Sequence, residues 1–77
     1  MSVELLSIGK LAKATGTKVE TIRYYESVGL LAPPARTKSN YRAYSAQHLA
    51  RLSFIRRARA LGFSIDQVQE LLKLADQ

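Results

Sequence analysis

The order of apolar and polar residues predicts a short helix near the start of the chain. Apolar or small residues recur there at helical spacing, at Ile8, Leu11, Ala12 and Thr15. Ser7 precedes this run and can accept a hydrogen bond from a backbone amide of the first turn, as helix caps do. Gly16 follows the run and can take the left-handed conformation that ends a helix. We therefore expect a helix from Ser7 to about Thr15.

A second helix is predicted directly after the first. Thr17 and Glu20 have the spacing of a capping box, in which the hydroxyl accepts from one amide and the carboxylate reaches back to another. The helix is expected to run to Val28, where Gly29 ends it and the apolar Leu30 follows. Two helices joined by so short a turn predict a helix-turn-helix, whose second helix can enter a DNA major groove. Helical bundles contain the same hairpin, so this geometry alone leaves the function open.

The middle of the chain predicts a short antiparallel ribbon. An Ala-Pro-Pro-Ala break at 32–35 interrupts the helical pattern, and extended candidates follow at 36–37 and 41–44, around a turn-forming Lys-Ser-Asn. Side chains alternate across such a strand, so Tyr41 and Tyr44 are expected on opposite faces, with Tyr44 packed on the core. We interpret this ribbon as a wing beside the helix-turn-helix.

Two further helices are predicted after the ribbon. Ser45 can cap a long third helix that runs to Leu61, before Gly62 ends it. This helix carries two apolar stripes, which would make it central to the domain. The stripes are Leu49, Leu52 and Ile55, and Ala50, Phe54, Ala58 and Leu61. Ser64 and Gln67 form a second capping box, which begins a fourth helix. Its buried side is expected to hold Ile65, Val68, Leu71, Leu72 and Ala75.

Composition limits the chemistry that this chain can perform. Its 77 residues fit one small domain over residues 1–77, and no apolar run approaches the roughly 20 residues that a membrane span needs. With no cysteine and one histidine, His48, the chain lacks thiolate zinc ligands and a histidine cluster, so neither metal nor cofactor is expected. Cofactor-loop and metalloprotease motifs are absent, and the six acidic residues are scattered. We expect a cytoplasmic protein that is not an enzyme and does not contact a membrane.

Positive charge is concentrated in one stretch of the sequence. The formal net charge is +6, yet residues 36–59 hold seven basic residues and no acidic one, while the rest holds five basic and six acidic residues. A surface charged only for solubility mixes the two signs more evenly. The stretch therefore favours a polyanionic partner. Duplex DNA is the first candidate, and RNA is a weaker one because the tyrosines do not lie on a broad sheet that stacks bases.

Several strings resemble the DNA-binding domain of bacterial MerR-family transcription regulators. They are Ile8–Ala12, Val19–Glu26 with Ile-Arg-Tyr-Tyr-Glu, Gly29–Leu31, Asn40–Tyr44 with Tyr-Arg-Ala-Tyr, and Leu52–Ser64. The resemblance covers nearly the whole chain. It implies a mostly α fold, a winged helix-turn-helix in the order α-α-β-β-α-α, with four helices and a short two-stranded antiparallel wing. It also implies that the second helix reads the major groove, and that the turn between the last two helices is a second wing.

The resemblance assigns DNA contacts to residues at matching positions. The exposed start of the reading helix comes within reach of base edges, at Lys18, Val19, Glu20 and Thr21. Contacts to the DNA backbone fall to Arg23, Tyr25, Arg36, Tyr41, Arg42 and Arg59. The residues themselves add Lys38, at the basic tip of the ribbon, and Arg56, which lies on the same side of the third helix as Arg59. Ile22 is expected in the core and Tyr24 in packing. Arg23 could instead pair with Glu26 at helical spacing, but an exposed pair of this kind stabilises little, so a phosphate is expected to take the arginine.

The resemblance also implies partners and a mechanism. We predict sequence-specific binding of double-stranded DNA in transcription regulation, at an inverted or direct repeat in a promoter. In this family a dimer sits on the repeat, and effector binding distorts the DNA so that RNA polymerase can engage it. The dimerising helix, the effector-binding tail and the cysteine-bearing loop of metal sensors have no counterpart in this sequence. This chain is therefore expected to be a monomer, and a full-length form a homodimer.

Two explanations for these missing segments stay open. One alternative function also stays open. The chain is either a DNA-binding domain cut from a longer regulator, which the sequence favours, or a complete short protein. In the second case it resembles effectorless members and excisionases, architectural proteins that bind DNA repeats side by side. The alternative function is a protein-interaction module, in which the doubly apolar third helix docks a partner helix.

Overall fold

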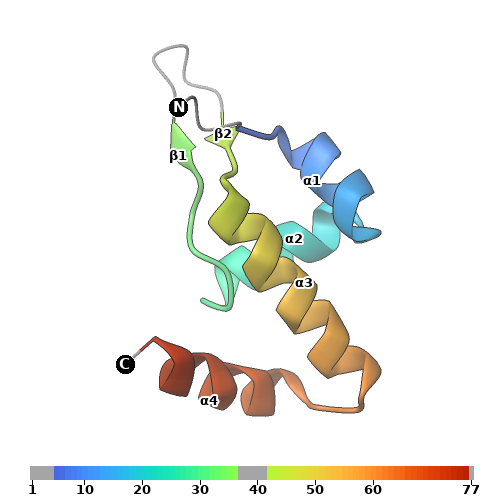
Figure 1. Ribbon diagram of the computed structural model, residues 1–77, viewed down its shortest axis with the longest axis vertical. Helices are drawn as coiled ribbons and strands as arrows, with labels where there is room; N and C mark the ends of the chain where they lie inside the picture. Colours follow the sequence, from blue (N-terminus) through green and yellow to red (C-terminus); the bar gives the residue numbers. More distant parts are fainter. Residues whose placement is uncertain (1–4, 37–41, 77) are drawn as a thin grey trace.

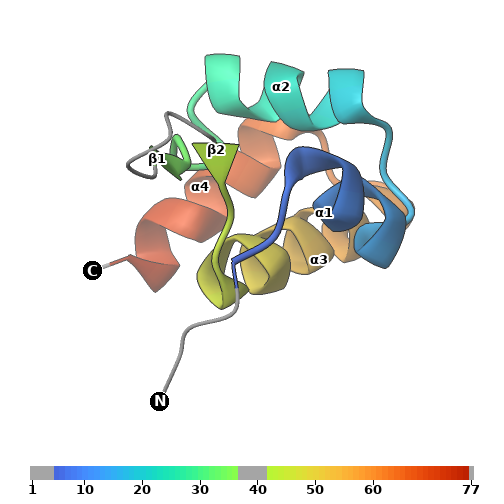
Figure 2. The same cartoon turned by 90° about the horizontal axis from the view of Figure 1, so that it is seen from above.

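The structure, a computed structural model, describes residues 5–36 and 42–76. Within these ranges the chain forms four helices and one pair of short strands (Figure 1). Their order is α1 (Ile8–Thr15), α2 (Val19–Ser27), β1 (Ala35–Arg36), β2 (Arg42–Ala43), α3 (Ala46–Ala60) and α4 (Ile65–Ala75). α1 packs against both α2 and α3, and α3 also packs against α4. The helices therefore surround one core, and α2 lies at an edge of the domain (Figure 2).

α1 begins and ends where the sequence predicts. The Oγ of Ser7 accepts a hydrogen bond from the backbone nitrogen of Lys10 at 3.2 Å, which satisfies one free amide of the first turn. Gly16 has a φ of 63°, a left-handed conformation that residues with a Cβ rarely adopt. Its amide donates to carbonyl groups of the last turn of α1. The residues at its two ends therefore determine where α1 begins and where it ends.

The predicted capping box of α2 is wrong. α2 is preceded by Lys18, which makes no side-chain capping bond. Thr17 is already used at the end of α1, because its amide donates to the carbonyl of Ala12 at 3.0 Å and its hydroxyl donates to the carbonyl of Thr15 at 3.4 Å. A residue that closes one helix in this way is not free to cap the next. α2 therefore begins one residue later than predicted.

The capping box of α4 is confirmed. The Oγ of Ser64 accepts from the backbone nitrogen of Gln67 at 3.1 Å, and the backbone nitrogen of Ser64 donates to Oε1 of Gln67 at 2.8 Å. α3 begins after Ser45 as predicted, where Nδ1 of His48 accepts from the Ser45 amide at 3.1 Å. Residues within the first helical turn therefore determine where α3 and α4 begin.

The core gathers apolar residues from all four helices and from the segments next to them. Ile22 and Tyr44 are fully buried, as predicted. The cluster comprises Leu11, Ile22, Tyr25, Leu30, Leu31, Tyr44, Leu52, Ile55, Ala58, Val68 and Leu72. Ile65 and Leu71 of α4 are half-buried, and Ala75 is exposed, so the predicted apolar face of α4 is covered over part of its length.

One of the two predicted apolar stripes of α3 is largely exposed. Leu52 and Ile55 are buried and Leu49 is half-buried, in agreement with the first stripe. In the second stripe, by contrast, Ala58 is buried, but Phe54 is 42% exposed and Leu61 is 75% exposed. α1 and α4 cover α3 on one side, and no element among residues 5–36 and 42–76 covers the other. α3 therefore buries one of its sides in the core and exposes much of the other, whereas both sides were predicted to be buried.

The winged part of the predicted fold class needs correction. The four helices carry the fold, and the described residues contain no extended ribbon, since pairing is limited to Ala35 with Ala43 and Arg36 with Arg42. Tyr44, which the prediction placed in the ribbon, pairs instead with Leu6 and packs its ring into the core. A two-stranded ribbon has little stability of its own in water, so it persists here only where the core anchors it. The predicted tip lies outside the described residues.

Tyr44 joins the end of β2 to α2. Its ring is fully buried, and its hydroxyl donates to Oε2 of Glu26 at 2.9 Å. Its backbone nitrogen and carbonyl both bond to Leu6 at 2.8 Å. Tyr44 therefore connects the end of β2 with α2 and with the segment before α1.

Replacing Tyr44 by phenylalanine is expected to lower the free energy of unfolding by about 1–2 kcal/mol, because a half-buried carboxylate loses a hydrogen-bond donor. Thermal unfolding followed by circular dichroism measures the loss. Tyr24→Phe is the matched control, since that ring is exposed and its hydroxyl can bond to water. Equal destabilisation of the two variants would contradict the role of the Tyr44 hydroxyl.

Candidate nucleic-acid interface

The outer face of α2 is exposed in the part of the domain that the structure describes. Lys18, Glu20 and Arg23 are exposed along it, and Val19 and Thr21 are half-buried beside them. In Figure 2, α2 runs along the upper edge of the domain with nothing beyond it. Ile22 faces inward and is fully buried. The face predicted to read base edges is thus accessible.

Arg23 stays available for an external partner. The ion pairs within residues 5–36 and 42–76 are Arg51 with Asp76 and Lys73 with Glu70. Glu26, the partner that the sequence offered to Arg23, accepts instead from the Tyr44 hydroxyl. Arg23 also borders a shallow groove of about 430 Å³ with Glu26, Ser27 and Pro33. The guanidinium therefore lies where α2 meets the segment that leads to β1.

Two tyrosines of α2 occupy the reverse of their predicted places. Tyr25, predicted to contact the DNA backbone, is 7% exposed and belongs to the core. Tyr24, predicted to pack, is 51% exposed, and its ring centroid lies 6.0 Å from that of Tyr25. The signal was present in the sequence, because Tyr25 follows the core residue Ile22 by three positions and so shares its face. Tyr24 is the tyrosine that the outer surface offers.

The β1–β2 pair brings two of the predicted basic positions opposite each other. The backbones of Arg36 and Arg42 are antiparallel partners, and the segment that follows α2 leads away from that helix to this strand pair (Figure 1). Lys38 and Tyr41, which were predicted to contact DNA, lie outside the described residues.

The two arginines predicted on α3 both donate to backbone carbonyls of the domain. Nη1 of Arg56 donates to the carbonyl of Thr15, in the turn between α1 and α2. Nη1 of Arg59 donates to the carbonyl of Phe63 at 2.9 Å, in the turn between α3 and α4. Sequence analysis placed both on one side of α3, and the structure directs them to two different turns.

Sequence analysis missed Gln69. This residue of α4 donates from Nε2 to the carbonyl of Val28 at 2.8 Å, just beyond the end of α2. The two residues are 41 positions apart, so no local pattern could have linked them.

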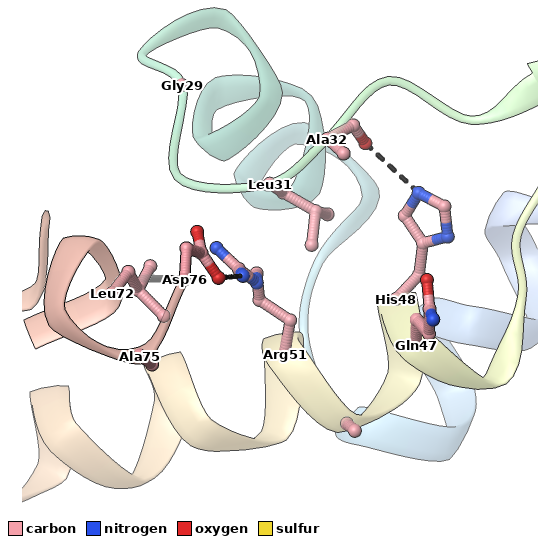
Figure 3. A pocket seen from close by; sticks show the side chains of 10 residues that line it. Gly29, Leu31, Ala32, Gln47, His48, Arg51, Leu72, Ala75 and Asp76 are labelled. Atoms are coloured by element: carbon pink, nitrogen blue, oxygen red, sulfur yellow. Dashed lines mark hydrogen bonds and ion pairs between the residues drawn. The ribbon is translucent and has the colours of Figure 1, made fainter.

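A groove of about 700 Å³ lies where the end of α2, the start of α3 and the end of α4 meet (Figure 3). Three of the polar side chains that line it, those of His48, Arg51 and Asp76, are engaged within the protein. Arg51 pairs with Asp76 across the groove, and Nε2 of His48 lies 3.1 Å from the carbonyl oxygen of Ala32 (Figure 3). Leu31 and Leu72 supply apolar walls. These bonds join α3 to the two neighbouring segments, so we interpret the groove as a structural junction.

Residues 5–36 and 42–76 contain no cluster of three or more His, Asp or Glu side chains that could hold a metal ion. The helices in the same ranges are too short or too polar to span a bilayer.

Comparisons with known proteins find similar bacterial regulators. Residues 6–75 match the family model described as MerR HTH family regulatory protein. The HTH-type transcriptional regulator ZntR homolog of Haemophilus influenzae is 54% identical over 69 residues, which are 90% of this chain and 51% of that protein. This chain therefore spans about half the length of the curated relatives that it matches.

Solved structures give the same result for the fold. The transcription regulator PbrR691 from Ralstonia metallidurans CH34, in complex with lead(II), is 48% identical with a TM-score of 0.85, over 92% of this chain and 56% of that one. HiNmlR, a MerR family regulator that lacks the sensor domain and is bound to promoter DNA, has a TM-score of 0.85 at 22% identity, over 94% of this chain and 55% of that one. The second likeness concerns the fold alone.

Proposed function

Because the chain belongs to the MerR helix-turn-helix family of regulatory proteins, we propose that it binds double-stranded DNA sequence-specifically in the control of transcription. The observation that carries this proposal is the uncovered outer face of α2, with Lys18, Glu20 and Arg23 exposed along it. A helix presented in this way fits the major groove, which is wide enough to admit one α-helix.

In this proposal the start of α2 reads base edges and arginines hold phosphates. A lysine such as Lys18 can donate to guanine, and a glutamate such as Glu20 can accept from the amino group of cytosine. Val19 and Thr21 supply apolar and hydroxyl contacts beside them. Arg23 binds the nearby phosphate. Further backbone contacts are proposed at Arg36, Lys38, Tyr41 and Arg42.

The partners of the whole regulator are a second part of the proposal. We assign residues 1–77 to one DNA-binding domain and place the protein in the cytoplasm, where bacterial DNA is accessible. In a full-length form two copies bind a repeated half-site in a promoter, because two-fold symmetry in the protein matches a repeat in the DNA. RNA polymerase is the proposed partner at that promoter.

Protein binding is a second candidate function, and one observation favours it. Phe54 and Leu61 lie seven residues apart on one face of α3, and both are well exposed. Apolar side chains exposed in a row are a common feature of protein contacts. A module of this kind would bind its partner without DNA.

Salt dependence distinguishes the two functions. A duplex enriched from a random library by this chain is titrated with protein at several salt concentrations. About five phosphate contacts predict a slope near −4.5 on the log-log scale, so affinity falls about 500-fold between about 50 mM and about 200 mM salt. An apolar interface is expected to survive the same change, because salt screens charges and does not weaken apolar burial. Failure to enrich any duplex would contradict the proposed function.

A further inference from the structure

Side chains from distant parts of the chain bond to backbone carbonyls on either side of α2. Before the start of α2, Arg56 of α3 donates to the carbonyl of Thr15, the last residue of α1. At the end of α2, Gln69 of α4 donates to the carbonyl of Val28, the residue that caps this helix. Both bonds join residues 41 positions apart. α3 and α4 therefore each contribute one side chain to the placement of α2.

The Arg56 guanidinium fits the end of α1 closely. The last carbonyls of a helix lack partners within the helix and carry its negative dipole end, which favours a cation there. A Cβ added to Gly16 would lie 3.0 Å from Nη1 of Arg56, so the guanidinium packs closely on this turn and would have to shift slightly to admit a side chain there. The arginine thus packs on the turn from which α2 begins.

Gln69 performs the matching task at the other end without a charge. Its amide satisfies the carbonyl of Val28, which has no partner within α2. Gln69 and Val28 are both half-buried, which reduces the competition from water for this bond. Because the side chain is neutral, any effect of Gln69 on DNA binding cannot arise from Coulomb attraction to phosphates.

We propose that Arg56 and Gln69 are positioning residues, which fix α2 on the domain so that its outer face meets base edges in register. The inference rests on the proposed DNA binding, and it assigns Arg56 to a hydrogen bond within the protein instead of to a phosphate. Hydrogen bonds to base edges demand close geometry. Attraction to phosphates tolerates displacement of the helix. Loss of either bond therefore lowers the affinity for the preferred sequence more than the affinity for DNA of any sequence.

The test compares Arg56→Met and Gln69→Met, which keep a long apolar stem and remove the donor. Arg57→Met is the control for charge, because Arg57 is exposed on the same helix and its variant has the same net charge as Arg56→Met. Fluorescence anisotropy measures binding to a duplex enriched by the wild-type chain and to a scrambled duplex. Arg56→Met and Gln69→Met are expected to bind the enriched duplex about tenfold more weakly, as for loss of one base contact. Arg56→Met should match Arg57→Met on the scrambled duplex.

A different pattern overturns the proposal. If Arg56→Met lowers the salt slope by about 0.9 and Gln69→Met retains full discrimination, Arg56 is a phosphate contact. Circular dichroism sets a temperature at which every variant is folded, and Arg56→Ala, which also removes the donor and the charge, replaces Arg56→Met if the latter does not fold.

Hydrogen exchange without DNA separates this inference from the proposed function. Faster exchange of the amides of Thr17 in Arg56→Met and of Leu30 in Gln69→Met is expected, since these amides close the turns at the two ends of α2. Unchanged exchange would overturn the positioning role even if the wild-type chain binds DNA. Absence of duplex enrichment by the wild-type chain, together with faster exchange in the variants, would instead overturn DNA binding and leave the two residues as holders of α2.

Discussion

The Leu52→Ala variant is expected to lose about 2–5 kcal/mol of its free energy of unfolding, the range found when a buried leucine is cut to alanine. Leu52 is 0% exposed and belongs to the same buried cluster as Leu11 and Ile22. A cavity at this position loosens the packing of α3 on α1, and α2 in turn packs on α1. Because a domain of this size has only about 4–12 kcal/mol in total, the variant is expected to be partly unfolded at room temperature. Urea unfolding measures the loss.

Leu61→Ala is the matched control on the same helix. Leu61 is 75% exposed, so the same truncation there is expected to change the free energy of unfolding by less than about 0.5 kcal/mol. The slope of the unfolding free energy against urea concentration should be the same in both variants if unfolding exposes the same amount of surface in each. Similar losses in the two variants would mean that the exposed stripe of α3 is covered in solution, against the description above.

Arg23→Ala is expected to weaken binding to an enriched duplex by about tenfold or more. Arg23 is exposed on the outer face of α2 and makes no ion pair within the described residues. A hydrogen bond to a charged group contributes about 1.5–3 kcal/mol, and each 1.4 kcal/mol is tenfold in affinity. Loss of one phosphate contact should also lower the salt slope by about 0.9. Titrations at several salt concentrations measure both quantities, and Arg23→Glu should be weaker still.

Arg57→Ala removes the same charge from an exposed position on α3. α3 lies across the domain from the outer face of α2 (Figure 2), so this variant is expected to change the affinity far less. Should the two variants weaken binding equally, DNA affinity would follow net charge alone. The assignment of α2 as the reading helix would then be wrong.

The helix ends were predictable because the bonds that make them are local. Ser7 caps α1, and Ser64 and Gln67 form the box that begins α4, each through contacts over three residues. Thr17 was the exception. The sequence pattern allows Thr17 either to end α1 or to cap α2. In the structure its amide bonds to the last turn of α1, and its side chain does not cap α2.

The candidate site was predictable to the extent that it follows helical periodicity. Exposure of Lys18 and Glu20 and burial of Ile22 follow from their positions around α2. The family motif, in contrast, assigned Tyr25 to the surface, and the period that places it beside Ile22 was the better guide. The partners of Arg56 and Gln69 could not be predicted, because the spacing of residues within one helix does not say which turn of another lies opposite.

By itself the sequence determined where the helices begin and end, apart from the start of α2, which side of each is apolar, and that positive charge gathers between residues 36 and 59. These properties depend on energies that act within about one helical turn. Only the tertiary structure decided that one apolar stripe of α3 is covered, that Tyr44 leaves the ribbon for Leu6, and that two distant side chains hold α2. Such choices depend on which surfaces pack together, because burial and long-range hydrogen bonds exist only after the helices have met.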